Sequence, residues 1–427
     1  MKARTFDSTY LDQLIEVLES MHQHCAAAPD RRSDALYHEL LARHYRNIRD
    51  AHSMGKKLIY HTAGMPTEIL YAMDVVPCGL EALCGSLTTQ CGLKDEALAT
   101  AKAYGLASEL CSLTRLEVGC TVNGWLPQPD GVIGTNLSCD IVSKGAYTLG
   151  RLWSCPNYFF EHNYQVNERE IAYVTSQLEG MVAFLEEITG RKMDWARLAQ
   201  AMENSREAML LESEVGELRK AMPSPLNNRT GMFAHLISSY CSGAPEAVQF
   251  FRVLRDEAQA RVARGVGTIQ EEKYRLLLFF EPPVYGWKLL DWLEREHGAK
   301  IVFEPLYSQW GAGEWEWDSD PAKLLESLAV NRAIRPVYRH LAGPIEPLVE
   351  DMVRGAQEYN VEGVMTFCHV GCRATSPCNR LLKDTIRDEL ELPFFAIEHD
   401  MADPAFASLD EMRDKIEGFL EMIDERR

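Results

Sequence analysis

Residues 361–400 read VEGVMTFCHVGCRATSPCNRLLKDTIRDELELPFFAIEHD. The apolar run 363–367 has the length of a buried strand, residues 379–391 have a helical pattern, and 394–397 form a second short apolar run. Three cysteines lie in the turn after the first run: Cys368, Cys372 and Cys378. In an open parallel sheet such loops lie at the carboxyl ends of strands, where α/β proteins bind their ligands. The stretch therefore predicts an α/β fold with a binding site at this loop.

The same arrangement occurs earlier in the chain. Residues 130–136 (DGVIGTN) predict a strand, Cys139 follows within three residues, and a helix and the apolar run 158–160 come next. Because the carboxyl ends of parallel strands share one edge of a sheet, two cysteine-bearing loops can face one crevice.

The composition is that of a globular, acidic protein. At 427 residues the chain exceeds one ordinary core, which predicts two or three domains. Its formal net charge of -19 argues against nucleic-acid binding, which depends on clustered Lys and Arg. No apolar stretch approaches the roughly 18 to 20 residues that span a bilayer, and the N-terminus lacks the apolar core of a signal peptide. We expect a cytoplasmic enzyme without nucleic-acid or membrane partners.

The cysteines are the most informative residues. Twelve is a high count for a chain without export signals, where cysteines outside the core are often metal ligands or catalytic. The sequence has no P-loop, no glycine-rich dinucleotide motif after a strand, no HExxH and no GxSxG. These absences argue against nucleotide binding and simple hydrolysis.

Widely spaced cysteines lie at the ends of predicted strands: Cys111, Cys139 and one of the group Cys368, Cys372 and Cys378. Three thiolates from three loops cannot form a zinc ribbon, whose ligands come as close pairs. They can hold an iron-sulfur cluster, in which an iron without a cysteine leaves a coordination site open. The alternative is that such cysteines are small buried apolar side chains, which fits Cys25, Cys155 and Cys241 best.

The alternation of patterns predicts the order of domains. Residues 1–55 look helical, 56–165 alternate strands and helices, 166–268 are helical, and 269–427 alternate again. Short strands separated by helices of this length predict parallel sheets with helices on both faces. The predicted fold class is α/β, with two doubly wound, flavodoxin-like sheets, a helical N-terminal segment and a helical insertion.

The first α/β unit opens with side chains that could handle protons. A strand near residues 58–61 ends at His61, Gly64 marks a tight turn, and Pro66 begins a helix that carries Glu68. After a second short strand, a loop is expected to hold three further residues: Cys78, Glu81 and Cys84.

Six segments in order carry a resemblance to a known family: HTAGMPTEILYAMDVVP, ELCSLTRLEVG, PQPDGVIGTNLSCD, EEKYRLLLFFEPP, GVMTFCHVGCRATS and AIEHDMADP. Over roughly residues 56–425, the chain resembles the cluster-bearing subunits of 2-hydroxyacyl-CoA dehydratases and benzoyl-CoA reductases. No single segment is decisive, but six in sequence are hard to obtain by chance.

The resemblance implies one 4Fe-4S cluster per chain, bound by Cys111, Cys139 and Cys372. Cys372 is preferred to Cys368 because it precedes the Arg of GCRATS. Whether four further cysteines are also ligands stays open: Cys368, Cys84, Cys120 and Cys378. In the dehydratase branch, the fourth iron is thought to take water or the substrate oxygen.

Three residues are candidates for catalysis: Glu81, Glu68 and His61. Glu81 matches a family glutamate near the open iron. Some relatives have a serine three residues before the proline of the P-x-E motif, where this chain has Ala63. The role of that hydroxyl is absent here or is taken over by His61 or Thr62.

The implied reaction eliminates water from a 2-hydroxyacyl-CoA through a ketyl radical that one low-potential electron starts. The implied partners are an acyl-CoA substrate, a homologous second subunit or a second copy, and a separate ATP-dependent iron-sulfur activator. The acyl group cannot be read from the sequence. Two tryptophans could line its pocket but are more often structural: Trp310 and Trp315.

Three alternatives stay open. The first is a dearomatising benzoyl-CoA reductase subunit. The second is a reductase with a double-cubane cluster and about eight irons per chain rather than about four, because this chain has extra cysteines. The third is a structural partner subunit without chemistry of its own.

Overall fold

Both predicted sheets are present, and every strand pair in them is parallel. The computed structural model describes residues 2–28, 30–137, 139–162, 167–308, 315, 317–318 and 320–427. The first sheet consists of β1 (Leu58–His61), β2 (Val76–Gly79), β3 (Gly131–Thr135) and β4 (Asn157–Phe160). The second consists of β5 (Tyr274–Phe279), β6 (Ala299–Phe303), β7 (Gly363–His369) and β8 (Phe394–His399).

The two sheets share one topology. The strand order is β2-β1-β3-β4 in the first and β6-β5-β7-β8 in the second. The chain therefore reverses direction across the sheet between β1 and β3 and again between β5 and β7, which is the doubly wound arrangement. The predicted fold class is confirmed. Ligands of such sheets bind at these switch points, beyond the carboxyl ends of the strands.

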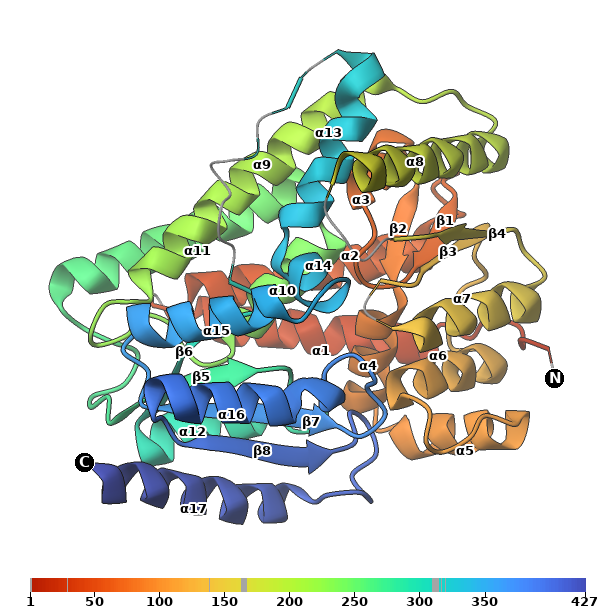
Figure 1. Cartoon of the computed structure of the whole chain (residues 1–427). Helices are drawn as coiled ribbons and strands as arrows, with labels where there is room; N and C mark the ends of the chain where they lie inside the picture. The colour runs from red at the N-terminus through yellow and green to blue at the C-terminus, as the bar shows by residue number, and fades with distance from the viewer. Residues whose placement is uncertain are drawn as a thin grey trace.

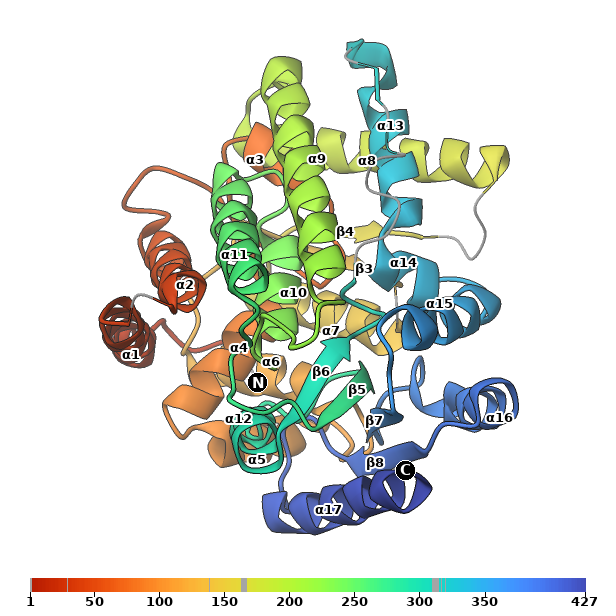
Figure 2. The same ribbon diagram turned by 90° about the vertical axis from the view of Figure 1, so that its left-hand side faces the viewer.

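Helices connect and cover the strands (Figures 1 and 2). The N-terminal helices are α1 (Thr9–Ala26) and α2 (Arg32–Asp50). The first α/β unit contains α3 (Thr67–Ala72), α4 (Leu80–Gln90), α5 (Lys94–Tyr104), α6 (Ser112–Asn123) and α7 (Asp140–Trp153). A helical stretch follows, with α8 (Glu168–Thr189), α9 (Trp195–Leu218), α10 (Thr230–Tyr240) and α11 (Pro245–Arg264). The second unit contains α12 (Lys288–His297), α13 (Pro321–Ile334), α14 (Pro336–Leu341), α15 (Glu346–Glu358), α16 (Asn379–Leu390) and α17 (Leu409–Arg426).

Each face of the first sheet has its own apolar core. On one face, Leu14 of α1 and Tyr45 of α2 pack with Leu58 and with helices α4, α6 and α7. On the other face, Ile59 packs with α8, α9 and α13. Trp315 belongs to this second core and donates its indole N–H to the carbonyl oxygen of Ser327 at 3.1 Å, which is a structural role. Trp310 lies outside the described residues.

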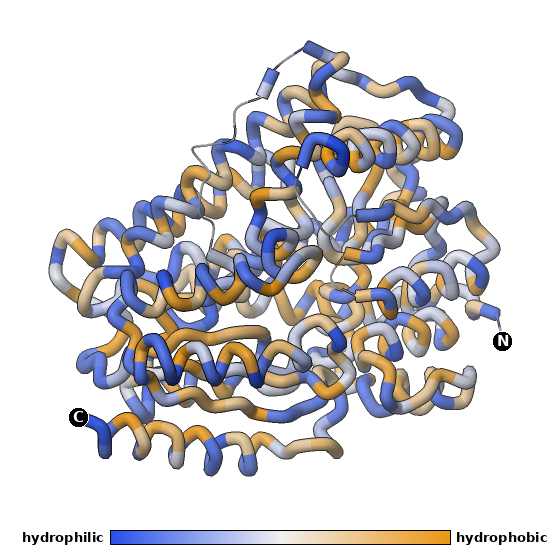
Figure 3. Tube along the Cα trace, in the orientation of Figure 1, coloured by the Kyte–Doolittle hydropathy of each residue, from blue (hydrophilic) through white to orange (hydrophobic). Residues whose placement is uncertain are grey.

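The second sheet is covered in the same way. Helices α12 and α17 bury one face, and α15 and α16 bury the other. In Figure 3 the side of α17 that faces β8 is apolar and the opposite side is hydrophilic. The buried residues of α17 recur at three- and four-residue spacing, as an amphipathic helix requires: Met412, Ile416, Phe419, Leu420 and Ile423.

One local prediction is wrong. Cys78 lies in β2, and Glu81 and Cys84 lie in helix α4 rather than in a loop. The physical reason is the apolar spacing of that helix, whose buried leucines are Leu80, Leu83 and Leu87. Helix α4 therefore holds Glu81 in its first turn, directly after the carboxyl end of β2. Among the described residues, no helix is long and apolar enough to cross a membrane.

Helices α5 and α6 approach each other so closely that Gly119 cannot be enlarged. A Cβ added there would overlap the backbone carbonyl of Ala97, which cannot move as a side chain could. We expect Gly119→Ala to lower the free energy of unfolding by about 1–3 kcal/mol. Gly418→Ala is the matched control, because nothing lies within 4 Å of a Cβ at Gly418 in helix α17. Alanine should stabilise that helix by about 0.5–1 kcal/mol. Urea denaturation of both variants checks this, and equal stability would contradict it.

Candidate functional site

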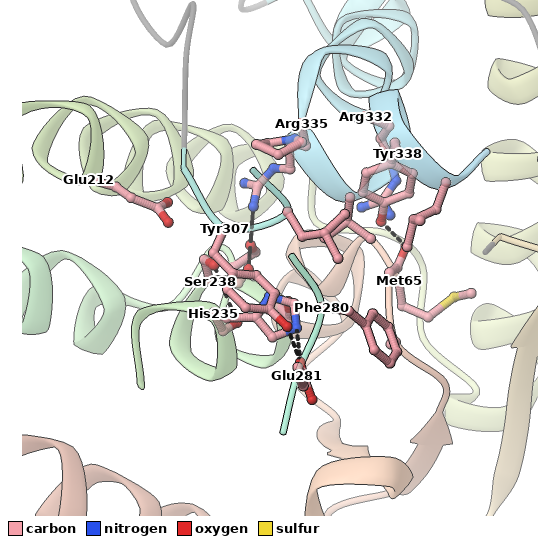
Figure 4. A pocket seen from close by; sticks show the side chains of 18 residues that line it. Met65, Glu212, His235, Ser238, Phe280, Glu281, Tyr307, Arg332, Arg335 and Tyr338 are labelled. Atoms are coloured by element: carbon pink, nitrogen blue, oxygen red, sulfur yellow. Dashed lines mark hydrogen bonds and ion pairs between the residues drawn. The ribbon is translucent and has the colours of Figure 1, made fainter. Parts of the chain in front are cut away.

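A cavity of about 140 Å³ opens between the two sheets (Figure 4). The loops after β1, β5 and β6 contribute to its walls, so it lies where doubly wound sheets bind ligands. Helices α9 and α10 and the segment from α13 to α14 complete it. The polar and charged side chains that line it are Glu212, His235, Ser238, Ser239, Ser242, Glu281, Tyr307, Arg332, Arg335 and Tyr338.

One wall of the cavity is a hydrogen-bonded group from the second sheet and α10. Tyr307 donates its hydroxyl to Glu281, and the Nε2 atom of His235 lies 3.7 Å from the same carboxylate oxygen. Nδ1 of His235 lies 3.2 Å from Oγ of Ser239. Burial lowers the pKa of His235 to about 3, so its imidazole is neutral near pH 7, and burial raises the pKa of Glu281.

The backbone next to this group is strained. Phe280, which directly precedes Glu281, has a φ of 63°. A bulky residue in the left-handed region is rare and raises the free energy by about 1–3 kcal/mol, and such strain gathers at binding sites. It turns the chain at the carboxyl end of β5 and brings Phe280 and Glu281 to the cavity.

Glu81 does not line the cavity, but it is hydrogen-bonded to the loop after β1, which does. Both of its carboxylate oxygens accept a hydrogen bond from the backbone N–H of Ala63, at 3.0 and 3.1 Å, and Ala63 lines the cavity. Burial raises the pKa of Glu81 to about 7. Burial also raises the pKa of Glu117 on α6, and the charge of Glu81 adds to that rise. A carboxyl that titrates near neutral pH suits a general acid or base.

The other two candidate catalytic residues are placed differently. His61 is fully buried, its Nδ1 lies 3.0 Å from the carbonyl oxygen of Thr62, and it does not line the cavity. Glu68 is also fully buried: it accepts a hydrogen bond from Ser205 at 2.6 Å and lies 3.7 Å from Arg335. Glu68 therefore contacts Arg335, which lines the cavity, but does not line the cavity itself.

The three candidate cluster ligands lie at the ends of strands and helices that converge. Cys111 is the residue before α6, Cys139 follows β3 and precedes α7, and Cys372 follows β7. Burial raises the pKa of Cys111 to about 12, and the charges of Cys372 and Cys139 act in the same direction. Cys372 likewise contributes to the raised pKa of Cys139, after burial. The three thiols are thus electrostatic neighbours.

Two of these thiols receive backbone hydrogen bonds at helix N-termini. The N–H groups of Leu113 and Thr114 point to Cys111 and oppose the rise of its pKa. Residues Ile141 and Val142 do the same for Cys139. Helix N-termini favour thiolate, so the backbone prepares both positions for the anionic form.

Close backbone approach brings the second sheet to Cys111. A Cβ on Gly371 would lie 3.0 Å from the Cα of Cys111 and 3.0 Å from Nε2 of His369. Helix α6 and the loop after β8 are joined by Arg115 and Asp400, at 3.2 Å with both side chains 6% exposed. These contacts hold Cys111 beside the loop that carries Cys372.

The four cysteines whose role as ligands is open have partners of their own. Cys368 accepts a hydrogen bond from the Asn379 amide at 2.9 Å, and Cys378 donates to the carbonyl oxygen of Thr375 at 2.8 Å. Cys84 and Cys120 hydrogen-bond each other in the apolar core of the first unit. Within the described ranges, no three His, Cys, Asp or Glu side chains are close enough to hold a single metal ion. Each cysteine of a cubane binds a different iron, so its ligands are spread more widely.

Residues 62–423 match the family described as "2-hydroxyglutaryl-CoA dehydratase, D-component". The chain belongs to this family. It is 24% identical to the alpha subunit of (R)-2-hydroxyisocaproyl-CoA dehydratase of Clostridioides difficile over 420 residues, 93% of this chain and 97% of the relative. It is 23% identical to a benzoyl-CoA reductase subunit of Thauera aromatica, over 91% of this chain and 94% of the relative. The predicted membership in a family of dehydratase and reductase subunits is confirmed.

Several residues that line the cavity were not predicted from the sequence. Glu281 and Tyr307 follow predicted strands directly, in FFEPP and FEPLY, so the rule that strand ends carry the site could have found them. His235, Arg332 and Arg335 lie in helical stretches, and no spacing in the sequence marks them.

The raised pKa of Glu81 predicts a pH dependence of stability. Between its ordinary value of 4.5 and about 7, the folded state keeps a proton that the unfolded state has lost, so stability falls as pH rises through this range. In Glu81→Gln, the decrease in the free energy of unfolding between low and high pH should be smaller than in the wild type by up to about 3 kcal/mol. Urea denaturation from pH 5 to pH 8 measures it, with exposed Glu421→Gln of α17 as control. A wild-type slope in Glu81→Gln would contradict the assignment.

Proposed function

We propose that this chain is the iron-sulfur subunit of a 2-hydroxyacyl-CoA dehydratase. The observation that carries the proposal is the convergence of Cys111, Cys139 and Cys372 in a member of this family. Gly64 lines the cavity and packs so closely against Leu137 that a Cβ on Gly64 would overlap it. Leu137 lies two residues before Cys139, so this contact connects the cavity with the cysteine group.

The donor set fits a 4Fe-4S cluster. All three candidates are thiols, and thiolate is the ligand that iron-sulfur clusters require. Burial makes Cys111 and Cys139 resist ionisation, and bound iron would reverse that balance by favouring thiolate. Three cysteine ligands leave one iron of a cubane without a protein thiolate.

A bound cluster supplies single low-potential electrons and an iron that can act as a Lewis acid. The chain's own residues do the rest. The cavity encloses the acyl group and excludes water, and the Glu81 carboxyl lies behind its wall, where it accepts the backbone N–H of Ala63. With a pKa of about 7, the Glu81 carboxyl can accept or release the proton that elimination of water requires.

The relatives support a partner protein. The compared dehydratase proteins are named alpha subunits, the compared reductase protein is also named as a subunit, and such names imply multi-subunit enzymes. We propose a homologous partner or a second copy of this chain, and a separate ATP-dependent iron-sulfur activator. The absence of a P-loop in the sequence agrees with an external source of ATP hydrolysis.

A benzoyl-CoA reductase subunit is the second candidate. It is favoured by one observation: the identities to the reductase subunit and the dehydratase subunit are nearly equal, at 23% and 24%. The double-cubane alternative has less support, because Cys84 and Cys120 lie in the core and hydrogen-bond each other.

Removal of a ligand should remove the cluster. In protein purified without oxygen, we expect about four irons per chain and a cubane signal in electron paramagnetic resonance after reduction. Most of the iron should be lost in each of three variants: Cys111→Ala, Cys139→Ala and Cys372→Ala. The control is Cys155→Ala, at a half-buried cysteine, which should retain the iron. About eight irons would favour the double-cubane alternative. A folded wild type without iron, or Cys111→Ala with full iron, would sink the proposal.

Loss of the Glu81 carboxyl should affect turnover but not the cluster. We expect Glu81→Gln to lower kcat for a 2-hydroxyacyl-CoA, assayed with its activator, by about 10²- to 10⁴-fold, the usual contribution of a general acid or base. Iron content should stay at the wild-type value, and Glu421→Gln should turn over normally. Unchanged turnover in Glu81→Gln would exclude this residue from proton transfer.

A further inference from the structure

Arg332 is a buried cation in the cavity wall with hydrogen-bond donors that the described residues leave unsatisfied. Arg332 is 2% exposed and lines the cavity, and within the described part of the chain its Nε and Nη2 atoms have no hydrogen-bond partner. Its guanidinium stacks over the Tyr338 ring at 3.9 Å, which orients it without neutralising it. Burial lowers the pKa of Arg332 well below its ordinary value, although a guanidinium stays charged in proteins.

Arg335, one turn further on, already has partners. It donates to Asn331 at 3.1 Å and to the hydroxyl of Ser242 at 2.9 Å, and its Nη2 lies 3.7 Å from Glu68. Glu68 can compensate one of the two arginines. The charge of Glu68 also acts on Arg332, so this carboxylate is shared by the two arginines, and Arg332 is the one of the two that keeps buried donors without a hydrogen-bond partner.

Neither of the two acids among the described lining residues, Glu212 and Glu281, forms an ion pair with Arg332. Burial raises the pKa of Glu212 to about 8, so this carboxyl is mainly protonated at neutral pH. Burial also raises the pKa of Glu281, which accepts the Tyr307 hydroxyl on the opposite wall. Among the described residues, the Nε and Nη2 donors of Arg332 are therefore left to a bound group that can accept hydrogen bonds and carry negative charge.

We propose that this cavity binds an acyl group with a carboxylate at its far end, and that Arg332 pairs with that carboxylate. The inference rests on the proposed function, because it treats the cavity as the acyl pocket. The size agrees: a cavity of about 140 Å³ is comparable with the roughly 150 Å³ cavity that holds benzene in an engineered protein. A short dicarboxylic acyl chain has about as many non-hydrogen atoms. An uncharged chain would leave the two unpartnered donors of the buried Arg332 guanidinium unsatisfied, which is unfavourable.

The test compares thioesters that differ in the terminal charge. Calorimetric titration of the anaerobically purified full-length protein, with any subunit that copurifies, uses glutaryl-CoA and adipoyl-CoA against pentanoyl-CoA and hexanoyl-CoA. We expect at least one carboxylated thioester to bind about tenfold to a hundredfold more tightly than its uncharged counterpart. Arg332→Met should abolish that preference. Arg252→Met, an exposed arginine of α11 paired with Glu207, should retain it.

Each outcome decides the matter. Equal binding of the two kinds of thioester by the wild type overturns the inference and leaves the proposed function standing. Equal weakening of both kinds in Arg332→Met also overturns it, because Arg332 would then hold a phosphate of CoA, which all four thioesters share. The wild-type comparison remains valid if Arg332→Met does not fold. Absence of any thioester binding, together with absence of iron, would mean that both the inference and the proposed function are wrong.

Discussion

Arg115 and Asp400 come from different halves of the molecule and meet at 3.2 Å with both side chains 6% exposed. A buried ion pair of this kind adds little net stability, because desolvation of both charges offsets their attraction, yet removal of one partner costs about 3–5 kcal/mol. The main effect of this ion pair is therefore to fix the position of the two segments that carry it. Ser112 reinforces it, since its hydroxyl accepts the backbone N–H of Ala402 at 3.0 Å. The start of α6 is fixed to the loop after β8, and Cys111 is fixed with it.

This constraint matters because neither sheet brings the cysteines together alone. Two of the proposed ligands belong to the first sheet, and Cys372 belongs to the second. A cluster bound by all three would join the two units, so its binding energy would add to the stability of their interface. Gly371 is the residue whose size decides how closely the units approach, because any side chain there would press on the Cys111 backbone.

The sequence allowed the strands to be predicted because parallel strands buried on both faces are continuous apolar runs; β1 begins and ends where predicted. Cys139 and Cys372 follow strands as the same rule expects, whereas the predicted strand before Cys111 is wrong, because Cys111 lies between α5 and α6. Helix α4 was missed because Gly79 directly before it and Gly85 within it resemble the glycines of a turn. Arg332 and Glu212 could not be found, because their role depends on burial and on missing partners, which arise only when α9, α13 and α14 pack over the loop after β1.

The walls of the site differ in origin, and this difference bears on how one family can include proteins named for different acyl groups. Glu81, Cys139 and Cys372 lie shortly after the carboxyl ends of sheet strands, and Cys111 lies at the start of α6. The polar walls of the cavity come mainly from α9, α10 and the segment from α13 to α14. Side chains on these helices can change without moving a strand end, because each helix is anchored by its own apolar core. Redox chemistry and acyl recognition would then vary independently, with the sheets constrained by the cluster and the helices by the substrate.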